Sequence, residues 1–259
     1  MKSITIKSLS ALLLPTLFSL SMLGHTSEQK SEHKDLQWSY TGDTGPKHWG
    51  DLGAENIACK QGLNQSPVDI KRTFDARLPS IKFDYSMLIG ENIVNNGHSI
   101  QINVREGGSI KLDGKEFFLK QFHYHSPSEN MIDSQSFPLE AHFVHASKEG
   151  ELAVVALLYK PGAPDKALDV LIKNLPMNVG DKNRLGAKDL EFLERSKKIK
   201  DYFRFNGSLT TPPCTEGVRW IVSHSQPSIS RNQLNAFQKA LKHPNNRPIQ
   251  PINARTILR

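Results

Sequence analysis

The side chains with the clearest potential for chemistry in this chain are three histidines on two segments typical of β-strands. His123 and His125 stand two positions apart in the run Gln-Phe-His-Tyr-His, and His142 follows in a second such run. Side chains two positions apart in a strand point to the same face of a sheet. If the two strands are neighbours, three imidazoles converge and leave a fourth ligand position open. That arrangement is typical of catalytic zinc, whereas structural zinc is closed by four protein ligands.

Each of these strands also offers a partner for a metal-bound ring. A His-x-His pair alone is a weak signal, because most such pairs are surface or core histidines. Gln121 stands two positions before His123, and Glu140 stands two positions before His142. Metal-bound histidine usually donates its second N–H to such an amide or carboxylate, so these residues favour the metal site. His145 falls on the opposite face from His142 and is expected to be structural.

The pattern of apolar residues predicts a mainly β (α+β) protein with peripheral helices. Residues 147–150 are typical of a hairpin turn leading from the His142 strand into 152–158, which is apolar on both faces and therefore expected in the middle of a sheet. Strands dominate, so we predict one large, mainly antiparallel sheet. The predicted strands are 81–85, 98–104, 109–112, 115–125, 139–147, 151–159 and 217–224, and the predicted helices are Asp165–Asn174, Ala187–Glu194 and Arg231–Leu241.

The first residues are typical of a secretory signal peptide. Lys2 and Lys7 precede the uncharged stretch 8–27, which is rich in leucine. A membrane anchor is the alternative, but serines, a threonine, a proline and a glycine interrupt the stretch. We therefore expect a signal peptide over 1–25, a flexible leader over 26–36 and a single domain over 37–259. The protein is expected in the periplasm or secreted, with no membrane anchor after processing.

Two cysteines, Cys59 and Cys214, lie far apart in the chain. In an oxidising compartment two such cysteines most simply form one disulfide, and two unrelated buried thiols are the alternative. The net charge is +7, but the positive residues are scattered apart from 196–200 and 239–243. These two segments are interpreted as solvated faces, and no nucleic-acid partner is expected.

Several short motifs together resemble the α-class carbonic anhydrases, in particular their exported bacterial members. The resemblance runs from about Trp38 to Pro248. It implies a single domain around a large twisted, mostly antiparallel sheet of about ten strands. It also implies reversible hydration of carbon dioxide to bicarbonate and a proton through attack by a metal-bound hydroxide. The motifs are Asn64-Gln-Ser-Pro-Val-Asp-Ile70, Asn96-Gly-His98, the two histidine runs, Ser128-Glu-Asn130 and Ser208-Leu-Thr-Thr-Pro-Pro-Cys214.

The resemblance assigns roles to individual residues. It implies that His123, His125 and His142 bind Zn²⁺, with Gln121 and Glu140 as indirect ligands. Thr210 matches the hydroxyl that accepts a hydrogen bond from the bound hydroxide and donates one to Glu129. The apolar wall that holds carbon dioxide would be Val144, Val154, Leu209, Thr211, Val218 and Trp220.

Proton export is assigned in the same way. His98 matches the proton shuttle, and Tyr40, Asn96 and Gln101 match the residues that order the water path. Cys59 and Cys214 match the disulfide of exported members. Asn130 replaces a histidine often found after the glutamate and is expected to stand apart from the chemistry. A small-molecule substrate and a possible homodimer are the partners implied.

Two other functions are compatible with part of the pattern. His123-x-His125-x-x-x-Glu129 resembles the metal motif of a cupin, but the flanking glycines of that motif are absent, with Phe117 and Ser136 in their places. A non-catalytic, carbonic-anhydrase-like binding module is the second alternative. Such relatives typically lack a zinc histidine, whereas all three stand here.

Overall fold

The structure is a computed structural model of the 259-residue chain. It describes residues 37–105, 107–186, 189–190, 193 and 199–259. The expected signal peptide and leader, 1–36, and most of the predicted helix Ala187–Glu194 lie outside the described residues. Among the described helices, none is both long and apolar enough to cross a membrane.

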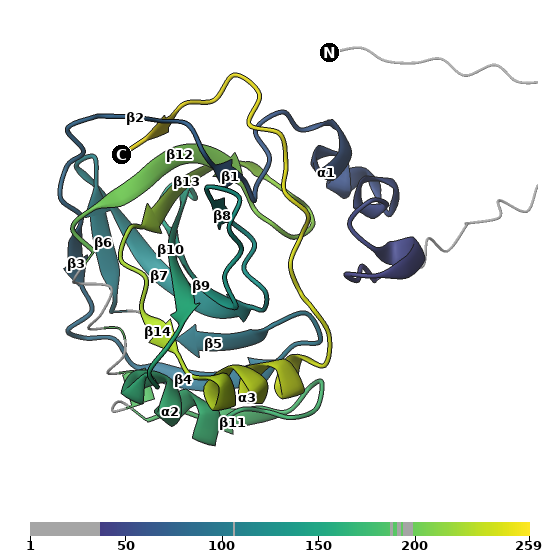
Figure 1. Cartoon of the computed structure of the whole chain (residues 1–259), viewed down its shortest axis with the longest axis vertical. Coiled ribbons are helices and arrows are strands. Elements are labelled where there is room, and N and C mark those ends of the chain that lie inside the picture. The colour runs from purple at the N-terminus through teal and green to yellow at the C-terminus, as the bar shows by residue number, and fades with distance from the viewer. Residues whose placement is uncertain (1–36, 106, 187–188, 191–192, 194–198) are drawn as a thin grey trace, which may run out of the picture. The chain divides into compact units, whose positions relative to one another are not determined.

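Strands form most of the regular structure in the described part of the chain (Figure 1). Each predicted strand is present with slightly different ends. The strands are β1 (Asp69–Ile70), β2 (Thr73–Phe74), β3 (Lys82–Asp84), β4 (Gly90–Asn95), β5 (Ile100–Val104), β6 (Ser109–Leu112), β7 (Lys115–His125), β8 (Met131–Ile132), β9 (Leu139–Ala146), β10 (Leu152–Pro161), β11 (Lys182–Arg184), β12 (Tyr202–Ser208), β13 (Glu216–Ser223), β14 (Ser228–Ile229) and β15 (Ile257–Leu258).

The described strands build a 13-stranded sheet and a separate pair, β1–β8. The main path of the large sheet runs β11-β4-β5-β7-β9-β10-β13-β12-β15-β2, while β3, β6 and β14 pair off this path. Most neighbours are antiparallel, but β10 runs parallel to β13. β9 and β10 form the predicted hairpin, in which Leu152 pairs with Ala146. β10 lies in the middle of the sheet, and residues 153–159 are buried, as its apolar sequence predicted.

The helices are short and lie at the periphery. The α-helices are α1 (Ala58–Gln61), α2 (Lys166–Lys173) and α3 (Arg231–Leu241), and the 3₁₀ turns are η1 (Gly42–Thr44), η2 (Trp49–Asp51) and η3 (Ala54–Asn56). Figure 1 shows α2 and α3 side by side next to β4 and β5. α3 starts where predicted because the Ser230 hydroxyl accepts from the Gln233 backbone N–H, while the Gln233 side chain accepts from the Ser230 N–H.

The two faces of the central strands carry different side chains. On β7 and β9, Phe122, Tyr124 and Phe143 belong to a large buried cluster that also takes in Leu168 of α2 and Phe237 of α3. His123, His125 and His142 alternate with these aromatic residues and therefore face the other way. A second, smaller cluster lies on the histidine face. One face of the sheet thus packs into the large core, and the other face carries His123, His125 and His142.

Two well-formed strands, β4 and β12, were not predicted. β4 has two adjacent apolar residues between polar ones, and β12 contains Gly207 next to a register shift, so neither shows clean alternation. The predicted strand 98–104 begins only at Ile100. His98 and Ser99 instead lie in the turn between β4 and β5, where the Asn96 side chain accepts their backbone N–H groups at 2.9 and 2.8 Å.

His145 lies on the core face and is expected to make the protein sensitive to acid. Its Nδ1–H donates to the Phe143 carbonyl at 2.9 Å, and its Nε2 lies 2.7 Å from the Tyr85 hydroxyl. Burial lowers the pKa of His145 to about 4. The unfolded chain binds this proton at about pH 6.5. Neutral His145 therefore contributes about 3 kcal/mol to the free energy of unfolding. This contribution is fully present above about pH 6.5 and is lost as the pH falls towards 4.

Urea unfolding between pH 7 and pH 4 tests this expectation. The free energy of unfolding should fall more steeply for the unsubstituted protein than for His145→Gln, because the glutamine cannot take up a proton. Other groups that titrate in this range contribute to both proteins and cancel in the comparison. Equal slopes for the two proteins would contradict the role of His145.

Candidate metal centre

The three histidines meet because β7 and β9 are paired neighbours. His123 is the register partner of His142, and His125 follows on the same face of β7. The ring centroids lie 4.9 Å apart for His123 and His125, 5.3 Å for His123 and His142, and 4.6 Å for His125 and His142. Each ring offers one nitrogen, and these nitrogens all lie within 4.8 Å of one another. The convergence expected from the strand pattern is therefore present.

Each ring has its other nitrogen next to an acceptor. Gln121 Oε1 lies 2.8 Å from His123 Nδ1, and Glu140 Oε1 lies 2.8 Å from His142 Nε2. The backbone carbonyl of Asn245 accepts from His125 Nδ1 at 2.7 Å. This carbonyl had no signal in the sequence, because every residue carries one. With these atoms engaged, Nε2 of His123, Nε2 of His125 and Nδ1 of His142 remain as ligand atoms.

The donor set fits a metal ion that prefers nitrogen ligands. His125 Nε2 is buried and has no hydrogen-bond partner in the described part of the chain, although Glu129 Oε2 lies 3.4 Å away. Burial is the main cause that lowers the pKa of all three histidines, and neighbouring imidazoles lower the pKa of His123 and His142 further. Neutral imidazole is the form that binds metal. Three neutral nitrogens on one face suit zinc.

Glu140 is held by a set of hydrogen bonds that the sequence did not predict. The backbone N–H groups of Glu129 and Asn130 donate to Glu140 Oε2 at 2.7 and 2.8 Å, and the Asn130 side-chain amide donates to Oε1 at 2.7 Å. Asn130 therefore touches the residue that contacts His142, which corrects the expectation that it stands apart. Burial raises the pKa of Glu140, and the Asn130 hydrogen bonds oppose that rise.

Glu129 lies beside the histidines without belonging to the three-nitrogen group. Its Oε1 accepts the backbone N–H of Arg247 at 2.8 Å. Burial raises the pKa of Glu129 well above its ordinary value, and hydrogen bonds from Arg247 and the Thr210 hydroxyl oppose the rise. A divalent cation nearby would also favour the ionised carboxylate. Thr210 and Glu129 are thus brought together, as the resemblance implied.

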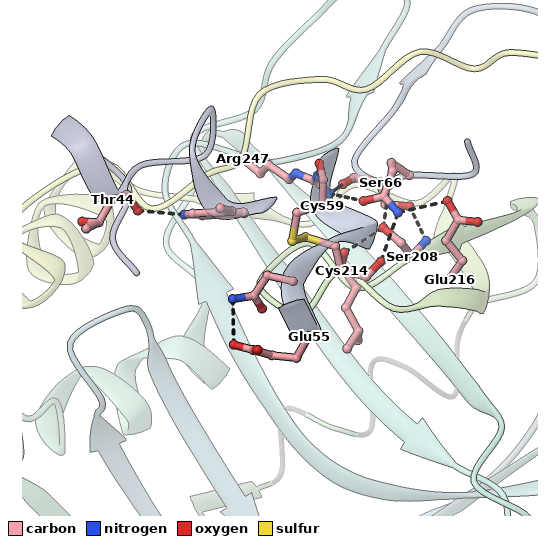
Figure 2. Close-up of a disulfide and its surroundings, with 12 residues drawn as sticks. Thr44, Glu55, Cys59, Ser66, Ser208, Cys214, Glu216 and Arg247 are labelled. Carbon is pink, nitrogen blue, oxygen red and sulfur yellow. Dashed lines mark hydrogen bonds between the residues drawn. A yellow bond between two sulfur atoms is a disulfide. The ribbon is translucent and has the colours of Figure 1, made fainter. Parts of the chain in front are cut away.

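A disulfide anchors Cys214, which lies four residues after Thr210 in the same loop. Figure 2 shows the disulfide and its surroundings. Cys59 and Cys214 are bonded, with their Cα atoms 5.0 Å apart. The Arg247 guanidinium donates to the Cys59 carbonyl at 3.1 Å and to the Ser66 carbonyl at 2.8 Å. The Ser66 N–H donates to the Ser208 hydroxyl at 2.9 Å. Motifs from three distant parts of the sequence therefore hold one another in place.

An apolar surface continues from His142 across the middle of the sheet. Val144 pairs with Val154, which in turn pairs with Trp220, and the Trp220 ring lies 4.9 Å from the His142 ring. Val218 is buried in the same cluster, and Leu209 packs against it. Thr211 is partly exposed on the Thr210 loop, and its carbonyl accepts the Cys214 N–H at 2.8 Å.

The remaining predicted residues lie around the turn between β4 and β5. His98 is partly exposed and stacks on Trp38, with ring centroids 3.7 Å apart. The Asn96 amide donates to Gln101 Oε1 at 3.4 Å, and Gln101 is the register partner of His123. The Trp38 contact was not predicted from the sequence.

Tyr40 lies close enough to Glu129 for the charge of that carboxylate to affect it. The Tyr40 hydroxyl is buried and has no hydrogen-bond partner among the described residues. Burial raises the pKa of Tyr40 well above its ordinary value, and the negative charge of Glu129 adds to the rise.

Comparison with known proteins shows the family of this chain. Residues 44–259 match the sequence profile of the family described as "Eukaryotic-type carbonic anhydrase". A carbonic anhydrase of Neisseria gonorrhoeae is 41% identical over 247 residues, which cover 95% of this chain and 97% of that protein. The α-carbonic anhydrase of Thermovibrio ammonificans, solved with the inhibitor sulfanilamide, is 41% identical with a TM-score of 0.80, over 86% of this chain and 99% of that chain. A hyperthermostable carbonic anhydrase from a hydrothermal vent chimney is 48% identical with a TM-score of 0.78, over 86% and 99%.

Proposed function

The chain belongs to the eukaryotic-type (α) carbonic anhydrase family and is a zinc enzyme that hydrates carbon dioxide reversibly, and we propose the following roles for its residues. The observation that carries the proposal is the group of three imidazoles, of which His125 and His142 are buried and His123 is partly exposed, next to an apolar surface. His123, His125 and His142 would hold the zinc. When bound, zinc lowers the pKa of a water ligand to about 7, a value known for this family, and so supplies a nucleophile at neutral pH.

The partners of the three rings fix which nitrogen faces the ion. Oxygen atoms of Gln121, Glu140 and the Asn245 backbone each lie next to one ring nitrogen. The other nitrogen of each neutral ring would then point its lone pair at the ion. Asn130 restrains Glu140 through its amide. These contacts support a role in setting ring orientation before zinc arrives.

The apolar surface beside His142 is suited to the substrate. Carbon dioxide has no charge and accepts hydrogen bonds poorly, so a dry surface holds it more readily than a polar one. Val144, Val154, Val218 and Trp220 lie on this surface, and Leu209 extends it towards Thr210. Thr211 would border the entrance.

Hydration also releases a proton, and we assign its export to His98. Imidazole titrates near neutral pH, so it can accept a proton from an ordered water and release it to the solvent. The partly exposed His98 ring stacks on Trp38, which also contacts Tyr40. The Asn96 amide donates to Gln101, the register partner of His123. These positions support a water path.

Replacing His98 by alanine tests this assignment together with the function itself. Stopped-flow hydration by zinc-loaded protein should show a lower kcat, because kcat contains proton export. The ratio kcat/KM should stay nearly unchanged, because it reports the steps up to hydration. Imidazole buffer should restore the lost turnover. A parallel fall in both parameters without rescue would place the shuttle elsewhere, and absence of hydration in the unsubstituted protein would refute the function.

The two alternative functions do not agree with the comparisons. The cupin interpretation is wrong, because residues 44–259 match the carbonic anhydrase family instead. The three intact histidines and the relatives named carbonic anhydrase argue against a non-catalytic binding module.

We further propose that the protein acts outside the cytoplasm. The disulfide between Cys59 and Cys214 is compatible with an oxidising compartment. The signal peptide over 1–25, the leader over 26–36, the domain over 37–259 and a homodimer remain expectations from the sequence.

A further inference from the structure

Four rings form a continuous series of contacts at the turn that carries His98. His98 stacks on Trp38, whose ring lies 5.4 Å from the Tyr40 ring, and the Tyr40 ring lies 6.3 Å from the His243 ring. We name Trp38, Tyr40, His98 and His243 the aromatic cluster. His243 follows α3 and comes from a segment that the sequence suggested to be only a solvated face.

The chain itself ties His243 to the His98 turn. Asn245, two residues after His243, donates its side-chain amide to the His98 carbonyl at 3.0 Å. The backbone carbonyl of the same Asn245 accepts from His125. The segment 243–245 therefore connects a zinc ligand with the shuttle turn and places a second imidazole beside it.

The side chain of His243 is exposed and carries one ring nitrogen with a lone pair. Its Nδ1 lies 2.9 Å from the Pro244 carbonyl, which can only accept, so Nδ1 carries the hydrogen. The lone pair of the neutral ring is therefore on Nε2. The residue as a whole is exposed to solvent. Its ring is therefore within reach of solvent and buffer, unlike the buried rings of His125 and His142.

We propose that His243 is a second proton acceptor, which takes the exported proton from His98 and passes it to solvent or buffer. The proposal rests on the carbonic anhydrase function and adds a residue to its proton path. In this step the His98 imidazolium loses its proton through water and becomes neutral, and His243 Nε2 binds that proton. The His243 imidazolium then gives the proton to a buffer base, so both rings return to their starting state.

The electrostatics of the pair agree with this arrangement. Burial lowers the pKa of His98, and the positive charge of His243 lowers it further. Among the described residues, no carboxylate contributes to the shift in the pKa of His98. A charged His243 therefore favours proton release from His98, which couples the two rings.

The substitution His243→Gln tests the proposal in zinc-loaded protein. At low buffer concentration kcat should fall by about two- to fivefold, less than the loss of a primary acid or base. The ratio kcat/KM should not change, and high concentrations of imidazole buffer should remove the difference. In a His98→Ala background, His243→Gln should cause no further loss, because the proton no longer arrives by way of His98. His224→Gln is the matched control, since His224 is an exposed histidine at the far end of β13 from the Thr210 loop.

A titration of His98 by NMR provides a readout that does not depend on turnover. Removing the charge of His243 should raise the apparent pKa of His98, whereas His224→Gln should leave it unchanged. An unchanged His98 titration together with an unchanged kcat would overturn the proposal, as would an equal fall of kcat and kcat/KM. If the unsubstituted protein did not hydrate carbon dioxide, the proposed function would fail, and the His98 titration would still decide whether His243 is coupled to it.

Discussion

Replacing any one of His123, His125 and His142 by alanine is expected to abolish both tight zinc binding and carbon dioxide hydration. Only two protein nitrogens would remain, while catalytic zinc in proteins is normally held by three. His125 is fully buried, and its Nε2 has no hydrogen-bond partner among the described residues. A substitution there also leaves the Asn245 carbonyl without its donor.

Zinc content per protein, measured by mass spectrometry of the metal, should be read together with the hydration rate. His224→Ala serves as the control, because it removes an exposed imidazole that lies outside the three-nitrogen group. Circular dichroism shows whether each variant is folded. Stoichiometric zinc and full activity in a His123→Ala, His125→Ala double variant would show that the metal lies elsewhere.

The zinc ligands could be predicted from the sequence because strand periodicity fixes the face of a side chain. Side chains two positions apart in a strand lie on the same face, so Gln121, His123 and His125 share one face of β7. Glu140 could be grouped with them once β7 and β9 were assumed to be neighbours. The pattern contained no information on which strands pair, and family resemblance supplied that step. Local periodicity therefore predicted which side chains share a face of a strand, while the pairing of β7 with β9 places these side chains next to one another.

Contacts made by backbone atoms or by distant segments could not be predicted in this way. The Asn245 carbonyl beside His125, the Asn130 amide on Glu140 and the Trp38 ring on His98 depend on how loops close over the sheet. β4 and β12 were missed because their apolar and polar residues do not alternate cleanly. His243 was missed because a basic segment after a helix is usually solvated, and only its contact with Tyr40 separates it from an ordinary surface residue.

The second large effect is expected at Thr210, where a single hydroxyl is held in position from several sides. The residue is 5% exposed, and its loop is closed by the Leu209 N–H, which donates to the Thr215 carbonyl at 2.9 Å. The disulfide at Cys214 anchors the end of the same loop. Glu129 Oε1 accepts from the Arg247 backbone N–H, and the Thr210 hydroxyl forms a hydrogen bond with the same carboxylate.

Because the Thr210 hydroxyl donates to Glu129, its oxygen would act only as a hydrogen-bond acceptor towards the nucleophile. That restriction would orient the nucleophile towards carbon dioxide on the apolar surface. Thr210→Ala should therefore retain zinc and lower kcat/KM by about 10²–10³-fold, the usual effect of removing one positioned hydrogen bond. Thr210→Ser keeps the hydroxyl and should recover much of the rate, which a purely structural role of the threonine methyl group would not allow. Stopped-flow hydration of the zinc-replete variants measures both, and unsubstituted rates in Thr210→Ala would mean that orientation of the nucleophile does not depend on this residue.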